Sequence, residues 1–287
     1  MDDAADAARL MWTLFEPVHG VCYFIPEARS AFESAGLRGF WRGYFAGRAA
    51  PLRTASAAVV SASFYNFASP MVARAIPGIW ELISPEEALR VRLAGAVDAL
   101  ATLLAGRESE VTAAAGLLWQ VIGELDCAGR VLAAANAALP APDEPLARLW
   151  QAATLLREHR GDGHFAALLA ADIDGCEAVV LRCAADLRRE DMQPVRGWTD
   201  EQWDEARSRL TGRGWISPDG EITAAGRDGH AHVEEATDRA AARPWARLGP
   251  AATAELADVL TPIAQACAKA IPYPSPIGVP APRTLTR

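Results

Sequence analysis

The run from Ser84 to Gly106 constrains the fold more than any other part of the sequence. Ser84 precedes Pro85 and Glu87, which is the order of an N-cap serine, a proline at the first helical position and a glutamate at the third. Leucine and valine then recur at helical spacing up to Leu104, and Gly106 follows as a stop signal. This stretch therefore predicts a well-capped amphipathic helix.

Comparable patterns cover most of the chain, so the expected fold class is mainly α. Pro17 is expected to interrupt the first helical pattern. The other predicted helices are separated by proline or glycine. The expected helical ranges are 4–16, 84–105, 109–122, 127–138, 143–160, 165–187, 199–210, 229–242 and 250–270.

Charge and cysteine usage limit the class of protein. The 287 residues carry a net charge of −8, which argues against a general nucleic-acid binder because phosphate binding requires a basic surface. Five cysteines without a C-x-x-C pair are typical of reduced thiols in a cytoplasmic protein. The acidic start at residues 1–3 differs from a basic signal peptide, and no apolar run has the length of a membrane span. We therefore expect a cytoplasmic protein with no membrane partner.

The sequence changes character near residue 196, and we expect two parts. Residues 1–195 would form a helical domain with a ligand pocket, and residues 196–287 a smaller module. Strong turn residues at 217–220 lie between two short apolar stretches that can form strands. The sequence from Arg209 to Asp228 resembles the end of the recognition helix and the wing of MarR-type winged-helix proteins. That resemblance implies a MarR-like winged helix, which C-terminal helices and a proline-rich tail would follow.

A looser resemblance links the chain to a little-characterised actinobacterial family labelled helix-turn-helix. Three stretches carry it, namely residues 16–19 (EPVH), 64–67 (FYNF) and 157–164 (REHRGDGH). The resemblance implies an architecture and no particular activity.

The expected recognition helix is acidic where a DNA-binding helix needs basic residues. Its carboxylates are those of Asp200, Glu201, Asp204 and Glu205. They would face phosphates or base edges with the wrong sign, so DNA is not the expected partner. We expect the winged helix to be a structural element, or to contact a second copy or a protein partner together with the tail.

The densest group of ionisable side chains lies between Arg157 and His164. Arg157 and Arg160 fall on the apolar arc of the preceding helix, where plain solvated charge is not expected. Gly161 and Asp162 suit a tight turn between two helices, which would place His164 in a first helical turn. The positive end of a helix disfavours imidazolium, so His164 is expected to be neutral. The arginines either hold an anionic ligand or reach carboxylates elsewhere in the protein, and both interpretations stay open.

Two further polar groups lie in apolar surroundings. Glu16 and His19 stand three positions apart, and a carboxylate that orients an imidazole is a common general-base arrangement. A satisfied buried polar pair is the alternative. Tyr65 and Asn66 lie between two phenylalanines and can orient a substrate in an aromatic pocket, although core packing with helix capping explains them equally well.

The motifs of cofactor sites are missing from the sequence. It contains no H-E-x-x-H, G-x-G-x-x-G, Walker A or G-x-S-x-G motif. We therefore expect no metal and no cofactor. The alternative is that Glu16, His19, His159 and His164 converge in space as metal ligands.

The function hypothesis is a cofactor-independent acid–base enzyme of bacterial specialised metabolism that acts on a small, anionic molecule. Its residues are the catalytic Glu16, His19 and His164 and the substrate-binding Tyr65, Asn66, Arg157 and Arg160. The alternatives are a ligand-binding winged-helix regulator and a non-catalytic partner subunit.

Overall fold

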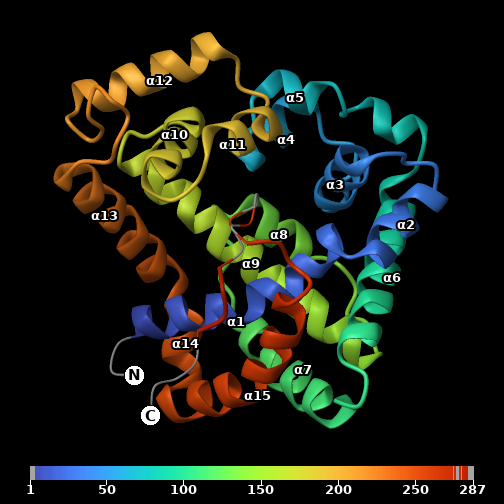
Figure 1. Ribbon diagram of the computed structural model, residues 1–287. Coiled ribbons are helices and arrows are strands. Elements are labelled where there is room, and N and C mark those ends of the chain that lie inside the picture. The colour runs from blue at the N-terminus through green and yellow to red at the C-terminus, as the bar shows by residue number, and fades with distance from the viewer. Residues whose placement is uncertain (1–3, 274, 276–277, 279, 284–287) are drawn as a thin grey trace.

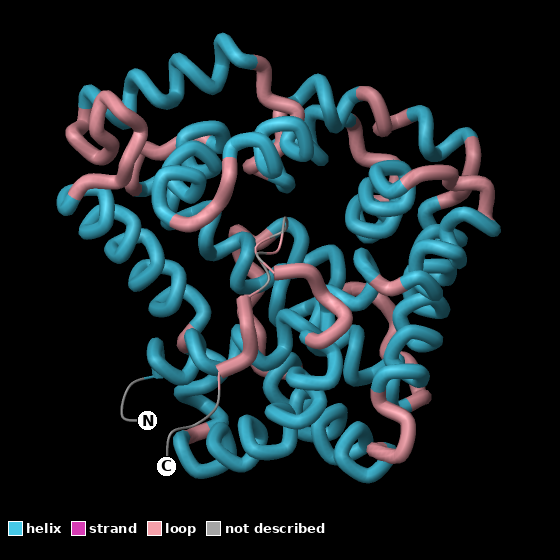
Figure 2. Tube along the Cα trace, in the orientation of Figure 1, coloured by secondary structure: helices cyan, strands magenta, loops and turns pink. Residues whose placement is uncertain are grey.

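The structure is a computed structural model that describes residues 4–273, 275, 278 and 280–283. Helices form most of this part of the chain and short loops join them (Figure 2), so the expected mainly α fold is confirmed. Two short 3-10 helices span Ala50–Leu52 and Gly78–Glu81. The α-helices are α1 (Ala4–Phe24), α2 (Pro26–Ser34), α3 (Phe40–Ala49), α4 (Ala57–Phe64), α5 (Ser69–Ala73), α6 (Pro85–Leu103), α7 (Glu108–Ile122), α8 (Val131–Ala137), α9 (Pro145–Ala170), α10 (Gly175–Ala185), α11 (Arg189–Arg196), α12 (Asp200–Gly212), α13 (Ala224–Ala241), α14 (Arg243–Leu248) and α15 (Pro250–Ala268).

The helix α6 begins as the sequence predicts. The Ser84 hydroxyl accepts a hydrogen bond from the backbone N–H of Glu87 at 3.1 Å, and Pro85 takes the first helical position. A Cβ atom at Gly95 would lie 2.9 Å from Cα of Ala28, so this glycine permits the close packing of α2 against α6.

Two predicted interruptions are wrong. The helix α1 continues through Pro17, and α9 continues through Gly161 to Ala170. Asp162 caps a different helix, because its carboxylate accepts a hydrogen bond from the backbone N–H of Ala133 in α8 at 2.9 Å. Contacts with α1, α7, α8 and α13 stabilise α9 along its length, and such packing outweighs the weak helix propensity of its glycines.

The segment from α12 to α13 contains the two expected helices without the expected strands. Within the described residues, the hairpin consists of one antiparallel bridge between Ile216 and Ile222. A Cβ atom at Gly226 would lie 2.0 Å from the carbonyl oxygen of Trp215. The glycine therefore lets the turn pack directly against the first turn of α13.

Two clusters of buried apolar side chains organise the molecule. The large core combines α1 to α8 and the first half of α9 with α14 and α15. The small core combines the end of α9 with α10 to α13. The division expected after residue 195 falls within the small core and stays a prediction.

The helix α9 lies near the middle of the molecule and joins the two cores (Figure 1). One end of the molecule holds α7, α14 and α15, and α13 runs along one side towards α12. Part of the tail lies on the protein's own surface, because the backbone N–H of Arg283 donates to the Thr13 hydroxyl at 3.1 Å. None of the helices in the described part has the length and apolarity of a membrane span.

Candidate functional site

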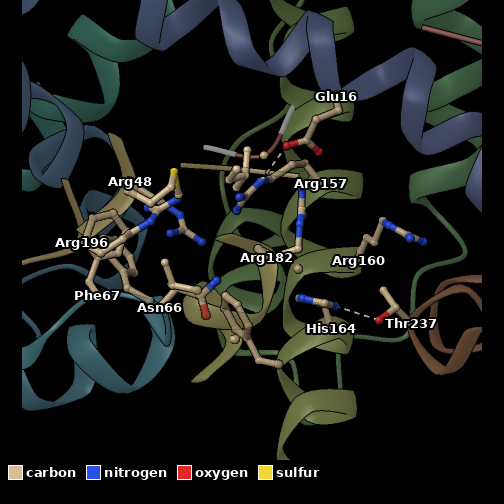
Figure 3. A pocket seen from close by; sticks show the side chains of 18 of the residues that line it. Glu16, Arg48, Asn66, Phe67, Arg157, Arg160, His164, Arg182, Arg196 and Thr237 are labelled. Carbon is tan, nitrogen blue, oxygen red and sulfur yellow. Dashed lines mark hydrogen bonds and ion pairs between the residues drawn. The ribbon is translucent and has the colours of Figure 1, made fainter. Parts of the chain in front are cut away.

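A cavity of about 150 Å³ lies beside the second half of α9, and its lining residues come from both cores (Figure 3). This volume holds about five water molecules, or a small organic ligand. The lining residues are Trp12, Glu16, Tyr44, Arg48, Phe64, Asn66, Phe67, Arg157, Arg160, Gly161, His164, Phe165, Ala178, Val179, Arg182, Leu187, Met192, Arg196, Glu234, Thr237 and Gly278. We call this cavity the arginine pocket.

One stripe of α9 forms a wall of the arginine pocket. Arg157, Arg160, Gly161 and His164 follow one another at intervals of three, one and three positions, which places them on the same helical face. The arc that the sequence indicated for the two arginines thus continues through the glycine to the histidine. Because Gly161 has no side chain, it leaves room in the middle of this face.

Two buried carboxylates hold the arginines at one end of the pocket. Nε of Arg157 lies 3.2 Å from Oε1 of Glu16, and Nη1 lies 2.9 Å from Oε2 of Glu158. Nε of Arg48 donates to Oε1 of the same Glu158 at 3.1 Å. Burial alone would raise the pKa of Glu158, but Arg157 and Arg48 hold it well below its usual value. For Glu16, burial outweighs the attraction of Arg157 and raises the pKa.

Three guanidinium groups of the pocket stack on aromatic rings. The guanidinium carbons of Arg48 and Arg196 lie 4.3 Å and 4.5 Å from the ring centres of Phe64 and Phe67. The corresponding carbon of Arg160 lies 4.5 Å from the Trp12 ring. Stacking covers the faces of these groups and leaves their edges for hydrogen bonds in the plane.

The helix α13 contributes Glu234 and Thr237 to the lining. Nη2 of Arg160 lies 2.7 Å from Oδ1 of Asp238, whereas its Nη1 is buried with no hydrogen-bond partner among the described residues. Nδ1 of His164 lies 2.9 Å from the Thr237 hydroxyl oxygen. Burial lowers the pKa of His164 to about 4, so the imidazole is neutral near pH 7. His164 lies inside α9, so burial causes this neutrality, and the helix start that the sequence indicated does not.

The structure brings five of the sequence-predicted residues to the arginine pocket and leaves two outside its lining. Inside are Glu16, Asn66, Arg157, Arg160 and His164. The two others, His19 and Tyr65, have partners elsewhere: Nδ1 of His19 lies 3.0 Å from the Thr154 hydroxyl, and the Tyr65 hydroxyl donates to the carbonyl of Ile173. Glu16 accepts hydrogen bonds from Arg157 and Trp12, so the expected pairing of Glu16 with His19 is not among its contacts.

Sequence reasoning missed several residues of the site. They are Arg48, Arg182, Arg196, Glu234 and Thr237 in the lining, and Glu158 and Asp238 behind it. Arg48 lies in an aromatic stretch of the sequence, which is a signal for a buried arginine. Glu234 and Asp238 have no comparable signal, because their arginine partners are distant in sequence, and Glu158 pairs both with its neighbour Arg157 and with the distant Arg48.

No group of three or more histidine, cysteine, aspartate or glutamate side chains in the described part of the chain can hold a metal ion. Burial raises the pKa of Cys22, Cys176 and Cys267 to about 12, so these thiols are protonated near pH 7. Among the described lining residues, arginine is the most frequent ionisable residue.

Comparison with known proteins identifies a family. A family model described as a helix-turn-helix family matches residues 8–274, which include all the described lining residues except Gly278. The curated proteins and the solved structures contain no match to the chain.

Proposed function

The chain belongs to this helix-turn-helix family, and on that premise we propose that it is a small-molecule-binding protein whose pocket takes a carboxylate ligand. The observation that carries the proposal is the presence of five arginines in the lining of one small cavity. Guanidinium groups recognise carboxylates through paired, charge-assisted hydrogen bonds. The unpartnered Nη1 of Arg160 is a donor that such a ligand can use.

The charge balance around the pocket favours a ligand with a single negative charge. The positive side chains of the site and its ion pairs are Arg9, Arg48, Arg157, Arg160, Arg182 and Arg196, and the negative ones are Glu16, Glu158, Asp186, Glu234 and Asp238. Among the described residues, these six positive and five negative charges leave a net charge of +1 when Glu16 is ionised, because His164 is neutral. A monocarboxylate matches this excess better than a dianion does.

The apolar part of the lining favours an aromatic ligand. Five aromatic rings line the cavity, those of Trp12, Tyr44, Phe64, Phe67 and Phe165. An aromatic ring that stacks on another ring or on a guanidinium group gains binding free energy beyond that of burying its apolar surface. A cavity of about 150 Å³ can accept a benzene ring, so the pocket suits a ligand with a single ring.

In this proposal the segment from α12 to α13 forms part of the pocket wall and does not bind DNA. The exposed face of α12 carries Asp200, Glu201, Asp204 and Glu205, and two basic residues at or just after its C-terminal end already have carboxylate partners. Nη2 of Arg209 pairs with Asp174, and Nη2 of Arg213 lies 2.9 Å from Oδ2 of Asp172. The helix α13 contacts α9 and α1 and thereby supplies Glu234 and Thr237 to the ligand site.

An acid–base enzyme is the second candidate, and one observation favours it. Glu16, whose pKa is raised, and neutral His164 line the same pocket. In this alternative Glu16 is protonated, in contrast to the charge balance above, so a bound carbonyl acid would meet a proton donor in Glu16 and a proton acceptor in His164. Incorporation of deuterium from solvent next to the carbonyl of phenylpyruvate, faster with protein than without it and slower in Glu16→Gln, would favour the enzyme. Binding of the acid without exchange would favour the binding protein.

Calorimetric titration with benzoate, phenylacetate and phenylpropionate tests the proposed function. At least one of these monocarboxylates is expected to bind, and its neutral methyl ester is expected to bind at least about tenfold more weakly. Arg182→Leu removes a guanidinium from the lining without burying an unpaired charge, because its partner Asp186 is 55% exposed. This variant should lower the affinity about tenfold.

Arg188→Leu is the matched control. Arg188 lies in the same part of the chain but outside the lining, and its side chain is 68% exposed. The control should bind the carboxylates as the wild type does. Equal binding of the acids and their esters, or equal loss in the two arginine variants, would overturn the proposal.

A further inference from the structure

The Thr237 hydroxyl donates its proton to a backbone carbonyl of its own helix. Its Oγ1 donates to the carbonyl oxygen of Val233, one turn earlier in α13, at 2.8 Å. A hydroxyl group has one proton, so Oγ1 can only accept in its contact with His164. Nδ1 of His164, which lies 2.9 Å away, must therefore carry a proton and donate it.

A second contact favours the same tautomer. Oε1 of Glu234 lies 3.8 Å from Nδ1 of His164, and a carboxylate beside this nitrogen stabilises an N–H group there and disfavours a lone pair. Burial keeps the ring neutral near pH 7, so the ring holds only this one proton. Nε2 of His164 consequently has a free lone pair and acts as a hydrogen-bond acceptor.

The acceptor nitrogen belongs to the pocket. Figure 3 shows the Thr237 contact on one side of the imidazole, with the other ring nitrogen turned towards the space between α9 and the side chains of Asn66 and Arg182. Arg160, one helical turn before His164, has a buried donor without a partner. The site thus presents donors to an anion and, beside them, one acceptor that requires a donor from the ligand.

Resting on the proposed function, we infer that the ligand is an aromatic carboxylic acid with a hydroxyl group, whose O–H donates to Nε2 of His164. The arginines bind the carboxylate, which has no proton to donate, so the acceptor nitrogen requires a second polar group on the ligand. The His164 side chain is 29% exposed, so Nε2 loses contact with water when a ligand covers it. An acceptor that is then left without a donor costs free energy, and the site therefore discriminates against the acid that lacks the hydroxyl. His164 has the role of a specificity-determining residue in this inference.

Nitrogen NMR of protein with isotope-labelled histidine tests the tautomer directly. The resonances of His164 are assigned as those missing from His164→Phe, and the wild type should show the proton on Nδ1 at neutral pH. Thr237→Val removes the acceptor of that proton and should increase the fraction with the proton on Nε2. A wild-type His164 that carries its proton on Nε2, or that is doubly protonated, would overturn the inference.

Paired ligands test the specificity. Calorimetric titration compares benzoate with meta- and para-hydroxybenzoate, and at least one hydroxylated acid should bind about tenfold more tightly than benzoate. In His164→Phe the ratio of the affinities should fall to about one, whatever the absolute affinity for benzoate. In Arg188→Leu, which lies outside the pocket, the ratio should equal that of the wild type.

The outcomes separate the two claims. If no aromatic acid binds, the proposed function fails. If benzoate binds and the hydroxyl group adds no affinity, the function stands and the role of His164 fails. An equal ratio in wild type and His164→Phe would also contradict that role.

Discussion

Gly161 decides how much room α9 leaves for a ligand. A Cβ atom at this position would lie 3.6 Å from Nη1 of Arg157 and 3.9 Å from Oε2 of Glu158, both ordinary contact distances. The glycine is therefore not required by the packing of its own helix, and its helix propensity is poor. Its position in the lining points to a role in keeping the pocket open.

Gly161→Leu is expected to abolish carboxylate binding without loss of stability. Leucine favours the helix by about 0.8 kcal/mol relative to glycine, while its side chain occupies the cavity. Calorimetry should show an affinity at least about tenfold lower, and denaturant unfolding a stability within about 1 kcal/mol of the wild type. Gly116→Leu in α7 is the control, because Gly116 is exposed and has no neighbour within 4 Å. Full binding in Gly161→Leu would contradict the assignment.

The buried imidazole of His159 predicts a loss of stability in mild acid. Burial lowers its pKa from 6.5 to about 4 in the folded protein, so the unfolded chain takes up a proton first as the pH falls. Stability is thus unaffected above pH 6.5 and decreases as the pH falls from 6.5 towards 4. Burial raises the pKa of Asp162 to about 6, so protonation of Asp162 stabilises the folded protein as the pH falls. The contribution of His159 is therefore measured as the difference between the wild type and a His159 variant.

Urea unfolding at pH 7 and pH 5 measures this effect. The wild type should lose about 2 kcal/mol more than His159→Gln between the two values, because glutamine does not titrate. An identical loss in both proteins would show that His159 does not cause the pH dependence.

At the scale of the elements, the start of α10 fixes how the two cores meet. A Cβ atom at Gly175 would lie 2.1 Å from the carbonyl oxygen of Tyr65, which follows the end of α4. Asp174 and Glu177 close a capping box around the same turn. The absence of a side chain at Gly175 therefore lets a helix of the small core touch the backbone of the large core beside the pocket.

Gly175→Ala is expected to destabilise the protein by about 2 kcal/mol or more, because backbone atoms on both sides must move apart. Denaturant unfolding measures the change. Gly212→Ala, at the end of α12 with no atom within 4 Å of the added Cβ, should leave stability unchanged or increase it by up to about 1 kcal/mol. Equal stability in the two variants would exclude a tight contact between α10 and Tyr65.

At the scale of the whole molecule, the pocket lies where the two cores meet. The lining takes its aromatic rings mainly from the large core and aliphatic side chains such as Val179 and Met192 from the small core. The polar network of α9 and α13 fills the region between them. A ligand bound here contacts both cores and should stabilise them together.

The net charge of −8 and the acidic face of α12 predict the absence of DNA binding. A gel-shift assay with random duplex DNA at low salt should show no retardation at micromolar protein, under conditions in which the same preparation binds an aromatic carboxylate. Retardation that decreases with added salt would contradict the prediction and would favour a DNA-binding regulator.

The sequence by itself determined the features that depend on neighbours within one or two turns. The N-cap at Ser84, the mainly helical fold and the shared arc of Arg157 and Arg160 follow from local spacing, and the structure contains all three. Local spacing also produced the errors at Pro17 and Gly161, where packing on several sides maintains the helix.

Only the tertiary structure decided which polar side chains contact one another. Arg48 and Glu158 are 110 positions apart, and His164 and Thr237 are 73 positions apart. Neither pair has a pattern in the sequence, because the packing of α3 and α13 near α9 brings them together. The environment of His164 follows from the same packing. Burial keeps the imidazole neutral, and the Thr237 hydroxyl, which donates its proton to Val233, favours the proton on Nδ1 of His164. The sequence thus indicated which residues of α9 line the pocket, and tertiary packing determined their partners.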